Sequence, residues 1–215
     1  MVCDATQLLL YTIIVFSNSV YSLASLFLPS VFLAKEISGF WVGIVFAMYS
    51  IAVITVSPFV GKVLDKIGTP NLLAMGLVGM GLSIIPLGFL QDIKSKSISI
   101  GVTLMLRFLQ GTSSACINTS CYSTAGNKYP KQTEFIIGML EAVSGIGCVA
   151  GLLGGAAIYE KLGYMNTFVG FGLLLPALAL ITRLLFVLVE KSENEREQPQ
   201  MEPLLENNNQ ESGEL

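Results

Sequence analysis

The stretch GKVLDKIGTP, residues 61–70, places three charged side chains between two long apolar runs. Lys62, Asp65 and Lys66 stand out because only 13% of the 215 residues are charged and 53% are hydrophobic. A soluble globular domain carries roughly 25% charged residues, so this composition is typical of a membrane protein. We therefore predict that the stretch is a polar turn between two membrane-spanning helices.

Apolar runs long enough to span a membrane lie on both sides of this turn. A helix needs about 20 apolar residues to cross the hydrocarbon core, and inside lipid it must satisfy its backbone hydrogen bonds within its own segment. Six runs meet this requirement: 8–33, 40–60, 72–90, 98–125, 135–159 and 164–189. We expect an all-α membrane protein, with a six-helix transmembrane bundle over residues 1–189. The first run is too long for a cleaved signal peptide, so we expect it to remain as an anchor.

Residues 190–215 differ sharply from the rest of the chain. They hold eight acidic and two basic residues and few apolar ones, which predicts an acidic, disordered tail. Six spans place both termini on the side of the 61–71 and 126–134 connections, which with the tail hold six basic residues against four in the opposite connections. This bias favours cytoplasmic termini. It leaves open whether the membrane is the plasma membrane or that of an intracellular vesicle.

The residue inventory argues against an enzyme. Histidine is absent, which excludes Ser-His-Asp catalysis, Cys-His catalysis and HExxH metal sites. The four cysteines have no CxxC spacing, so neither a disulfide framework nor a zinc site is indicated. We expect no enzymatic activity, no metal and no cofactor. The basic residues are few and scattered, which argues against nucleic-acid binding.

The opening stretch also carries a motif. Gly61, Asp65, Lys66 and Gly68 form a pattern that resembles the loop signature of the major facilitator superfamily of secondary transporters, between its second and third helices. Thr69 and Pro70 stand where that family usually has two basic residues, so the match is partial. The alternative is that any helical hairpin needs a turn with glycine and positive charge.

A second match lies in the fourth run. Its RFLQG segment, with Arg107, Gln110 and Gly111, resembles the fourth-helix motif of the same superfamily. An arginine at the centre of a membrane helix costs at least about 2.5 kcal/mol, so it should face the bundle interior or water. Helical spacing puts five residues on one stripe: Arg107, Gly111, Ser114, Asn118 and Cys121. We interpret the stripe as a cavity wall, with polar contacts between helices as the alternative.

A third match lies in the fifth run, which resembles the superfamily's antiporter signature. Gly147, Gly151 and Gly155 keep its four-residue spacing, while Leu152 and Ala156 replace its proline and last glycine. Such glycines form a flat face on which another helix can pack. Glu141 lies on the same helix, about 120° away from this face.

Together the matches extend over nearly all of residues 8–180. The branch that resembles this chain best is that of the vesicular amine and polyamine transporters, which frame their fifth helix as Gly138, Glu141, Gly163 and Tyr164 do here. Monoamine members carry Asp-Asn twelve residues before a first-helix proline, where this chain has Ser17 and Asn18. The acidic residue that would pair with an amine is missing, so the resemblance does not imply an amine substrate for this chain.

The first run still keeps polar residues on one side. We take Ser17, Asn18, Tyr21, Ser22 and Ser25, with Ser114 and Asn118 of the fourth run, as candidates for contacting a substrate. Uncharged hydrogen-bonding groups suit a neutral, zwitterionic or hydroxyl-rich solute better than a bare cation. Hydrogen bonding between helices is the alternative.

The resemblance implies transport by alternating access, but superfamily transporters have two six-helix halves. Three accounts stay open: two copies pair, a separate chain supplies the second half, or the product is truncated. Our leading hypothesis is the amino-terminal half of a proton-coupled solute transporter, with Arg107 and Glu141 as its intramembrane charges. The alternative is a truncated, non-transporting membrane protein that binds or regulates a full-length relative through the glycine face. The expected partners are the lipid bilayer and a small solute.

Overall fold

The computed structural model describes the backbone of residues 5–211 and the side chains of residues 5–186. Within this part, five α-helices and one 3₁₀ helix follow each other, and no strand occurs. They are α1 (Ala5–Ala34), α2 (Gly39–Ile67), α3 (Thr69–Ile84), η1 (Ile85–Asp92), α4 (Lys96–Lys128) and α5 (Thr133–Glu211). Five helical stretches are long and apolar enough to cross a membrane. The prediction of an all-α membrane protein is confirmed.

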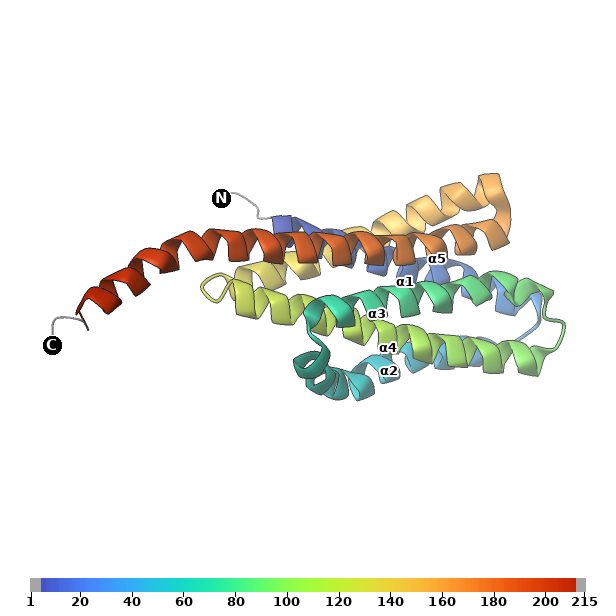
Figure 1. The fold of residues 1–215 in the computed structure, drawn as a ribbon. Coiled ribbons are helices and arrows are strands. Elements are labelled where there is room, and N and C mark those ends of the chain that lie inside the picture. Colours follow the sequence, from blue (N-terminus) through green and yellow to red (C-terminus); the bar gives the residue numbers. More distant parts are fainter. Residues whose placement is uncertain (1–4, 212–215) are drawn as a thin grey trace.

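The sixth span is the second arm of α5. Gly163 interrupts the helical backbone with φ 77° and ψ 176°, and the chain reverses its direction there (Figure 1). The arm before Gly163 covers the predicted run 135–159, and the arm after it covers the run from 164 onward. The side-chain hydroxyl of Tyr164 donates a hydrogen bond to the Leu87 carbonyl oxygen at 3.1 Å, which fixes the second arm against η1.

The predicted turn at 61–71 is wrong in its extent. Gly61, Asp65 and Lys66 lie inside α2, and Gly68 alone separates α2 from α3. Residues 62–67 include no helix breaker, so the helix continues past the apolar run. Gly68 ends it with φ 79° and ψ 157°, a conformation that is essentially restricted to glycine. Its backbone N–H still donates to the Leu64 carbonyl at 2.9 Å.

The third run also differs from the prediction, because α3 ends at Ile84 and the span continues as η1. Pro86 lies at the start of η1. Proline has no backbone N–H to donate, and its ring clashes with the carbonyl four residues earlier, so an α-helix cannot continue unchanged through it. The tighter 3₁₀ geometry carries the chain to Asp92.

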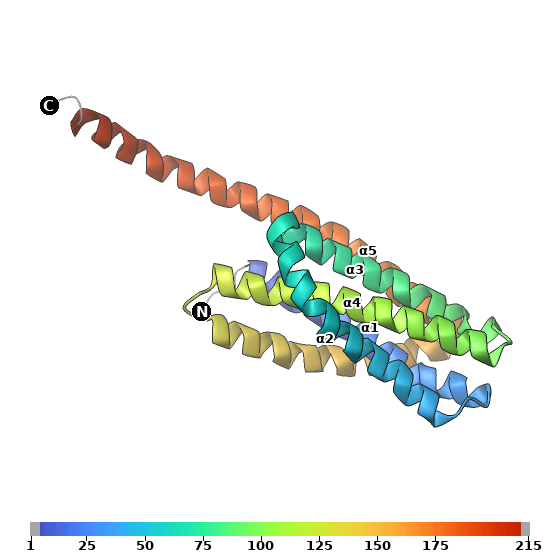
Figure 2. The same cartoon turned by 90° about the horizontal axis from the view of Figure 1, so that it is seen from below.

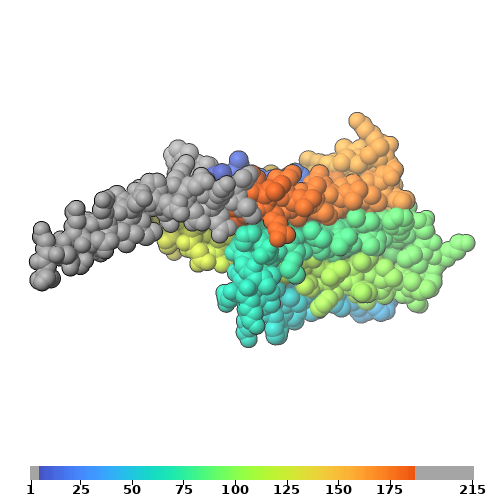
Figure 3. Space-filling model, in the orientation of Figure 1, coloured from blue at the N-terminus to red at the C-terminus, as the bar shows by residue number. Residues whose placement is uncertain are grey.

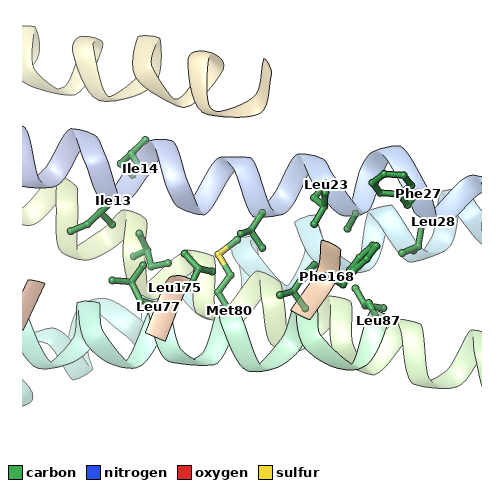
Figure 4. Close-up of a cluster of buried hydrophobic side chains, with 14 of the residues drawn as sticks. Ile13, Ile14, Leu23, Phe27, Leu28, Leu77, Met80, Leu87, Phe168 and Leu175 are labelled. Atoms are coloured by element: carbon green, nitrogen blue, oxygen red, sulfur yellow. The ribbon is translucent and has the colours of Figure 1, made fainter. Parts of the chain in front are cut away.

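The helices pack as a bundle in which α1 lies along α5, α2 along α4, and α3 along α4 and the second arm of α5 (Figures 1 and 2). The core combines side chains from α1, α3, η1 and the second arm of α5, including Leu23, Met80, Leu87 and Phe168 (Figure 4). At one end, Lys128 Nζ donates to Thr6 Oγ1 at 3.0 Å, and at the other, Lys96 pairs with Glu36 at 2.9 Å. That pairing holds the pKa of the Glu36 carboxyl below its usual value.

The trace of α5 is helical to Glu211, whereas the sequence predicts disorder from residue 190. Residues 1–4 and 212–215, and the side chains of 187–211, lie outside the described residues. The division into a membrane domain over 1–189 and an acidic tail over 190–215 therefore stays a prediction.

Candidate functional site

Polar side chains from three helices meet inside the bundle. We call them the polar cluster, and they are Tyr21 of α1, Tyr49 of α2, and Arg107, Gln110, Ser114 and Asn118 of α4. The close packing of α2 on α4 brings most of them together. Gly111 makes this approach possible, because a Cβ atom there would lie 2.4 Å from the Tyr49 carbonyl oxygen.

Arg107 is the buried charge of this cluster, with 0% of its surface exposed. Its Nη1 donates to Gln110 Oε1 at 2.7 Å. The guanidinium carbon lies 5.0 Å from the ring centre of Phe46 and 5.9 Å from that of Tyr21, within the range of cation–π attraction. These rings and one amide oxygen replace the water that the cation has lost.

Part of the Arg107 guanidinium remains unsatisfied. Its Nε and Nη2, and Nε2 of Gln110, have no hydrogen-bond partner among the described residues. The single ion pair in that part of the chain joins Lys96 to Glu36, so no described carboxylate neutralises Arg107. Buried donors without partners are rare, and a buried ionisable group in a membrane helix marks a functional position by default.

Gly111 and Ser114 of the α4 stripe face α2. Tyr49 Oη donates to Ser114 Oγ at 2.8 Å, and Asn118 Nδ2 contacts the same oxygen at 3.4 Å. The rings of Tyr21 and Tyr49 lie 4.6 Å apart. Ser114 therefore makes a polar contact between helices, which was the alternative to the interpretation of the stripe as a cavity wall. A part for the stripe in lining a solute path stays a prediction.

The polar residues predicted to lie on one side of the first span contact different parts of the bundle. Tyr21 reaches the polar cluster, whereas Ser22 Oγ donates to the Cys148 carbonyl of α5 at 2.8 Å. Asn18 Nδ2 and Ser17 Oγ donate to the Ile14 carbonyl one turn earlier, at 2.9 and 3.1 Å. Ser25 Oγ likewise donates within α1, to the Tyr21 carbonyl at 3.4 Å. Of the five candidates in α1, Tyr21 is the one in contact with Arg107.

The glycine face of α5 is covered by α1 of the same chain. A Cβ atom would lie 2.5 Å from the Val15 carbonyl oxygen at Gly147, 2.3 Å from that of Ser19 at Gly151, and 2.4 Å from a Leu23 methyl at Gly155. Ser19 Oγ also donates to the Gly147 carbonyl at 2.8 Å. We call this contact the glycine seam. Since α1 occupies it, the face is not free to bind a full-length relative.

Glu141 lies apart from Arg107. Its side chain is exposed and accepts a hydrogen bond from Tyr122 Oη of α4. The structure therefore does not bring together the two intramembrane charges of the sequence hypothesis.

Three residues at these contacts were not among the candidates predicted from the sequence. Phe46 and Tyr49 supply the aromatic and hydroxyl partners of α4, and Ser19 joins α1 to the glycine seam. The spacing of Phe46 and Tyr49 places them on one helix face. Aromatic residues on one face, in a helix next to one with an intramembrane arginine, are the signal that could have revealed them.

A profile of the Major Facilitator Superfamily matches residues 9–210, which is nearly the whole chain. The chain belongs to the Major Facilitator Superfamily. It is thus an integral, multi-pass membrane protein with the all-α fold that the apolar runs predicted.

Curated relatives are identical to this superfamily member at about a quarter of the aligned positions. The chain is 27% identical to the MFS-type transporter SLC18B1 of Mus musculus over 152 residues, which are 71% of this chain and 33% of the relative. It is 26% identical to the multi-drug resistance efflux pump PmrA homolog of Lactococcus lactis subsp. lactis (strain IL1403) over 158 residues, which are 73% of this chain and 37% of the relative. The chain thus spans about a third of the length of these relatives.

Proposed function

We propose that this chain is the amino-terminal half of a transporter that moves a small solute across a membrane by alternating access, coupled to protons. Family membership and relatives named as transporters or an efflux pump support transport. In secondary transporters the substrate lies near the midplane between two repeats that rock against each other. The second half would come from a second copy or from another chain, and both termini would be cytoplasmic.

The observation that carries the proposal is the unsatisfied charge of Arg107. A fully buried guanidinium with two nitrogens unpartnered among the described residues requires an anionic partner that these residues lack. A protonatable carboxylate in the second half would supply it in one conformation. Protonation of that carboxylate would release Arg107 and favour the other conformation, because only the charged form pairs strongly. Proton binding is then coupled to the movement of the halves.

The polar cluster also suggests the class of solute. Tyr21, Tyr49, Ser114 and Asn118 offer hydroxyl and amide groups beside aromatic rings, and no described carboxylate accompanies them. Such a surface suits a neutral or zwitterionic solute. It offers no counter-ion for a bare cation.

The decisive experiment measures uptake into liposomes that contain the chain together with its second half, with and without an imposed pH gradient. We expect Arg107→Gln to insert normally, because removal of a buried charge does not hinder insertion. Uptake driven by the pH gradient should fall at least tenfold. Arg107→Lys should keep part of this uptake, since lysine retains the positive charge but not the planar guanidinium group.

Lys62→Gln is the matched control, because it removes a positive charge from the last turns of α2, outside the polar cluster. It should transport as the unchanged protein does. Uptake by Arg107→Gln that still responds fully to the pH gradient would contradict the coupling role. Cysteines placed near Lys161, but not near Lys66, should react with reagents added outside; the reverse would overturn the proposed orientation.

A further inference from the structure

An apolar groove lies on the outside of the bundle, where α3 runs beside the second arm of α5. It has a volume of about 700 Å³ and is lined by Met75, Val78 and Leu82 of α3 and by Pro176 and Leu180 of α5, among others. Figure 3 shows the face of the molecule on which these two segments lie side by side. The volume falls within the range of about 300–1,000 Å³ that is usual for ligand pockets.

One end of the groove is polar. Asn71 and Arg183 line it there, close to the turn between α2 and α3. Arg183 follows Tyr164 by 19 residues (183 − 164), which is about 28 Å along a helix at 1.5 Å per residue. A second arm that begins at one membrane surface near Tyr164 therefore brings Arg183 to the opposite surface, about one hydrocarbon thickness away.

Arg183 is available for a ligand at this surface. Its side chain is exposed and has no ion pair with any described carboxylate. The Asn71 amide nitrogen already donates one of its two N–H groups to the Ile67 carbonyl at 2.9 Å, so the charged guanidinium is the main donor for an incoming anion. The groove thus combines one cation at the level of the lipid headgroups with an apolar channel that continues toward the middle of the bilayer.

We propose that this groove is a binding site for an anionic glycerophospholipid, with the phosphate on Arg183 and one acyl chain along Met75, Val78 and Leu180. A guanidinium matches phosphate geometry with paired hydrogen bonds, and basic residues at the headgroup level attract anionic lipids. A second helix is the competing occupant. The lone cation at the membrane surface favours the lipid, because a packed apolar helix would leave it without an anion.

The site is separate from the candidate transport site. The groove is formed by α3, the second arm of α5 and the last residue of α2, whereas the polar cluster belongs to α1, α4 and the middle of α2. A bound lipid would fill the contact between α3 and α5 and stabilise the bundle there. The proposal therefore holds or fails independently of solute transport.

Native mass spectrometry of the full chain tests the proposal, after incubation in detergent with equal amounts of phosphatidylglycerol and phosphatidylcholine. One basic residue at the headgroup level should favour the anionic lipid about fivefold. Arg183→Gln should abolish this preference, and Arg183→Lys should retain most of it. Leu180→Trp should reduce binding of both lipids, because the larger ring fills an exposed part of the groove.

Ile181→Trp is the control for the groove substitution, because Ile181 is exposed next to Leu180 but does not line the groove. It should bind lipid as the unchanged protein does. An undiminished anionic preference in Arg183→Gln would overturn the headgroup assignment, and unchanged binding in Leu180→Trp would overturn the groove. If cysteines introduced at Val78 form disulfides between copies in lipid membranes, a second copy occupies the groove and the proposal is wrong.

Discussion

Glycine has different structural roles in the glycine seam and at the two junctions between helices. In the glycine seam, Gly147, Gly151 and Gly155 stay helical, and their missing side chains leave room for the backbone of α1. At the two junctions between helices, Gly68 and Gly163 have open space around them or only a distant Pro70 atom, but their φ angles are +79° and +77°. In the seam, glycine is needed because it has no side chain. At the junctions, glycine is needed because it can adopt a positive φ angle.

The two junctions also repeat each other in sequence. Residues 65–71 read DKIGTPN and residues 160–166 read EKLGYMN, so an acid, a lysine, an aliphatic residue, the glycine and an asparagine recur in register. Asn71 Nδ2 donates to the Ile67 carbonyl and Asn166 Nδ2 to the Leu162 carbonyl, both at 2.9 Å. The junctions lie at opposite ends of the bundle (Figure 1). The stretch at 61–70 therefore has a counterpart three spans later, as in folds that are built from inverted repeats.

The largest expected effect comes from the seam. Gly151→Leu should destabilise the bundle by about 3 kcal/mol or more, because even its Cβ atom would lie 2.3 Å from the Ser19 carbonyl oxygen and a tight interface cannot absorb the side chain. Unfolding in a denaturing detergent titration measures this loss. Gly154→Leu is the matched control, since a Cβ atom there would meet no neighbouring element within 4 Å. Equal behaviour of the two variants would show that α1 does not cover the glycine face.

A smaller effect is expected at the junctions. Gly68→Ala and Gly163→Ala should each cost about 1–3 kcal/mol, because a residue with a Cβ atom is strained in this backbone conformation even where space is free. The same titration measures both. Gly61→Ala, inside α2 with no atom within 4 Å, should instead be neutral or stabilise by about 0.5–1 kcal/mol. If only one junction is sensitive, the two are not structural equivalents.

The all-α fold class could be predicted from the sequence. Each membrane span must satisfy its own backbone hydrogen bonds as a helix, and such a helix is visible in the sequence as a long apolar run. Hydropathy located the spans but not their ends. It placed Asp65 and Lys66 in a turn, although charged residues continue α2 for two more turns to Ile67. It also treated the third span as one α-helix, where Pro86 changes the geometry to 3₁₀.

The candidate site was harder to predict than the fold. The Arg107 motif located the buried charge, since charge in an apolar run is conspicuous. Gln110, on the same helix, was part of that motif, but the aromatic partners of Arg107 come from other helices, and a sequence does not say which face of α2 meets α4. Tyr49 and Phe46 therefore remained hidden, while Ser22, on the predicted polar side of α1, turned out to contact α5. Rotation of a helix within the bundle decides such contacts, and it depends on packing partners rather than on periodicity alone.

The smallest effect tests the junction repeat most sharply. Asn71→Ala and Asn166→Ala each remove one exposed hydrogen bond to the carbonyl of the residue before the junction glycine. Each should cost about 0.5 kcal/mol, near the low end for a hydrogen bond, because water can replace the partner at an exposed position. The same detergent titration should give matching losses, and the double variant should show their sum, since the two sites share no partner. Asn18→Ala is a useful comparison, because its Nδ2 makes the same type of bond, to the Ile14 carbonyl, but away from any junction. A clear loss at one junction and none at the other would reduce the repeat to a coincidence of sequence, because the two asparagines would then not contribute equally to stability.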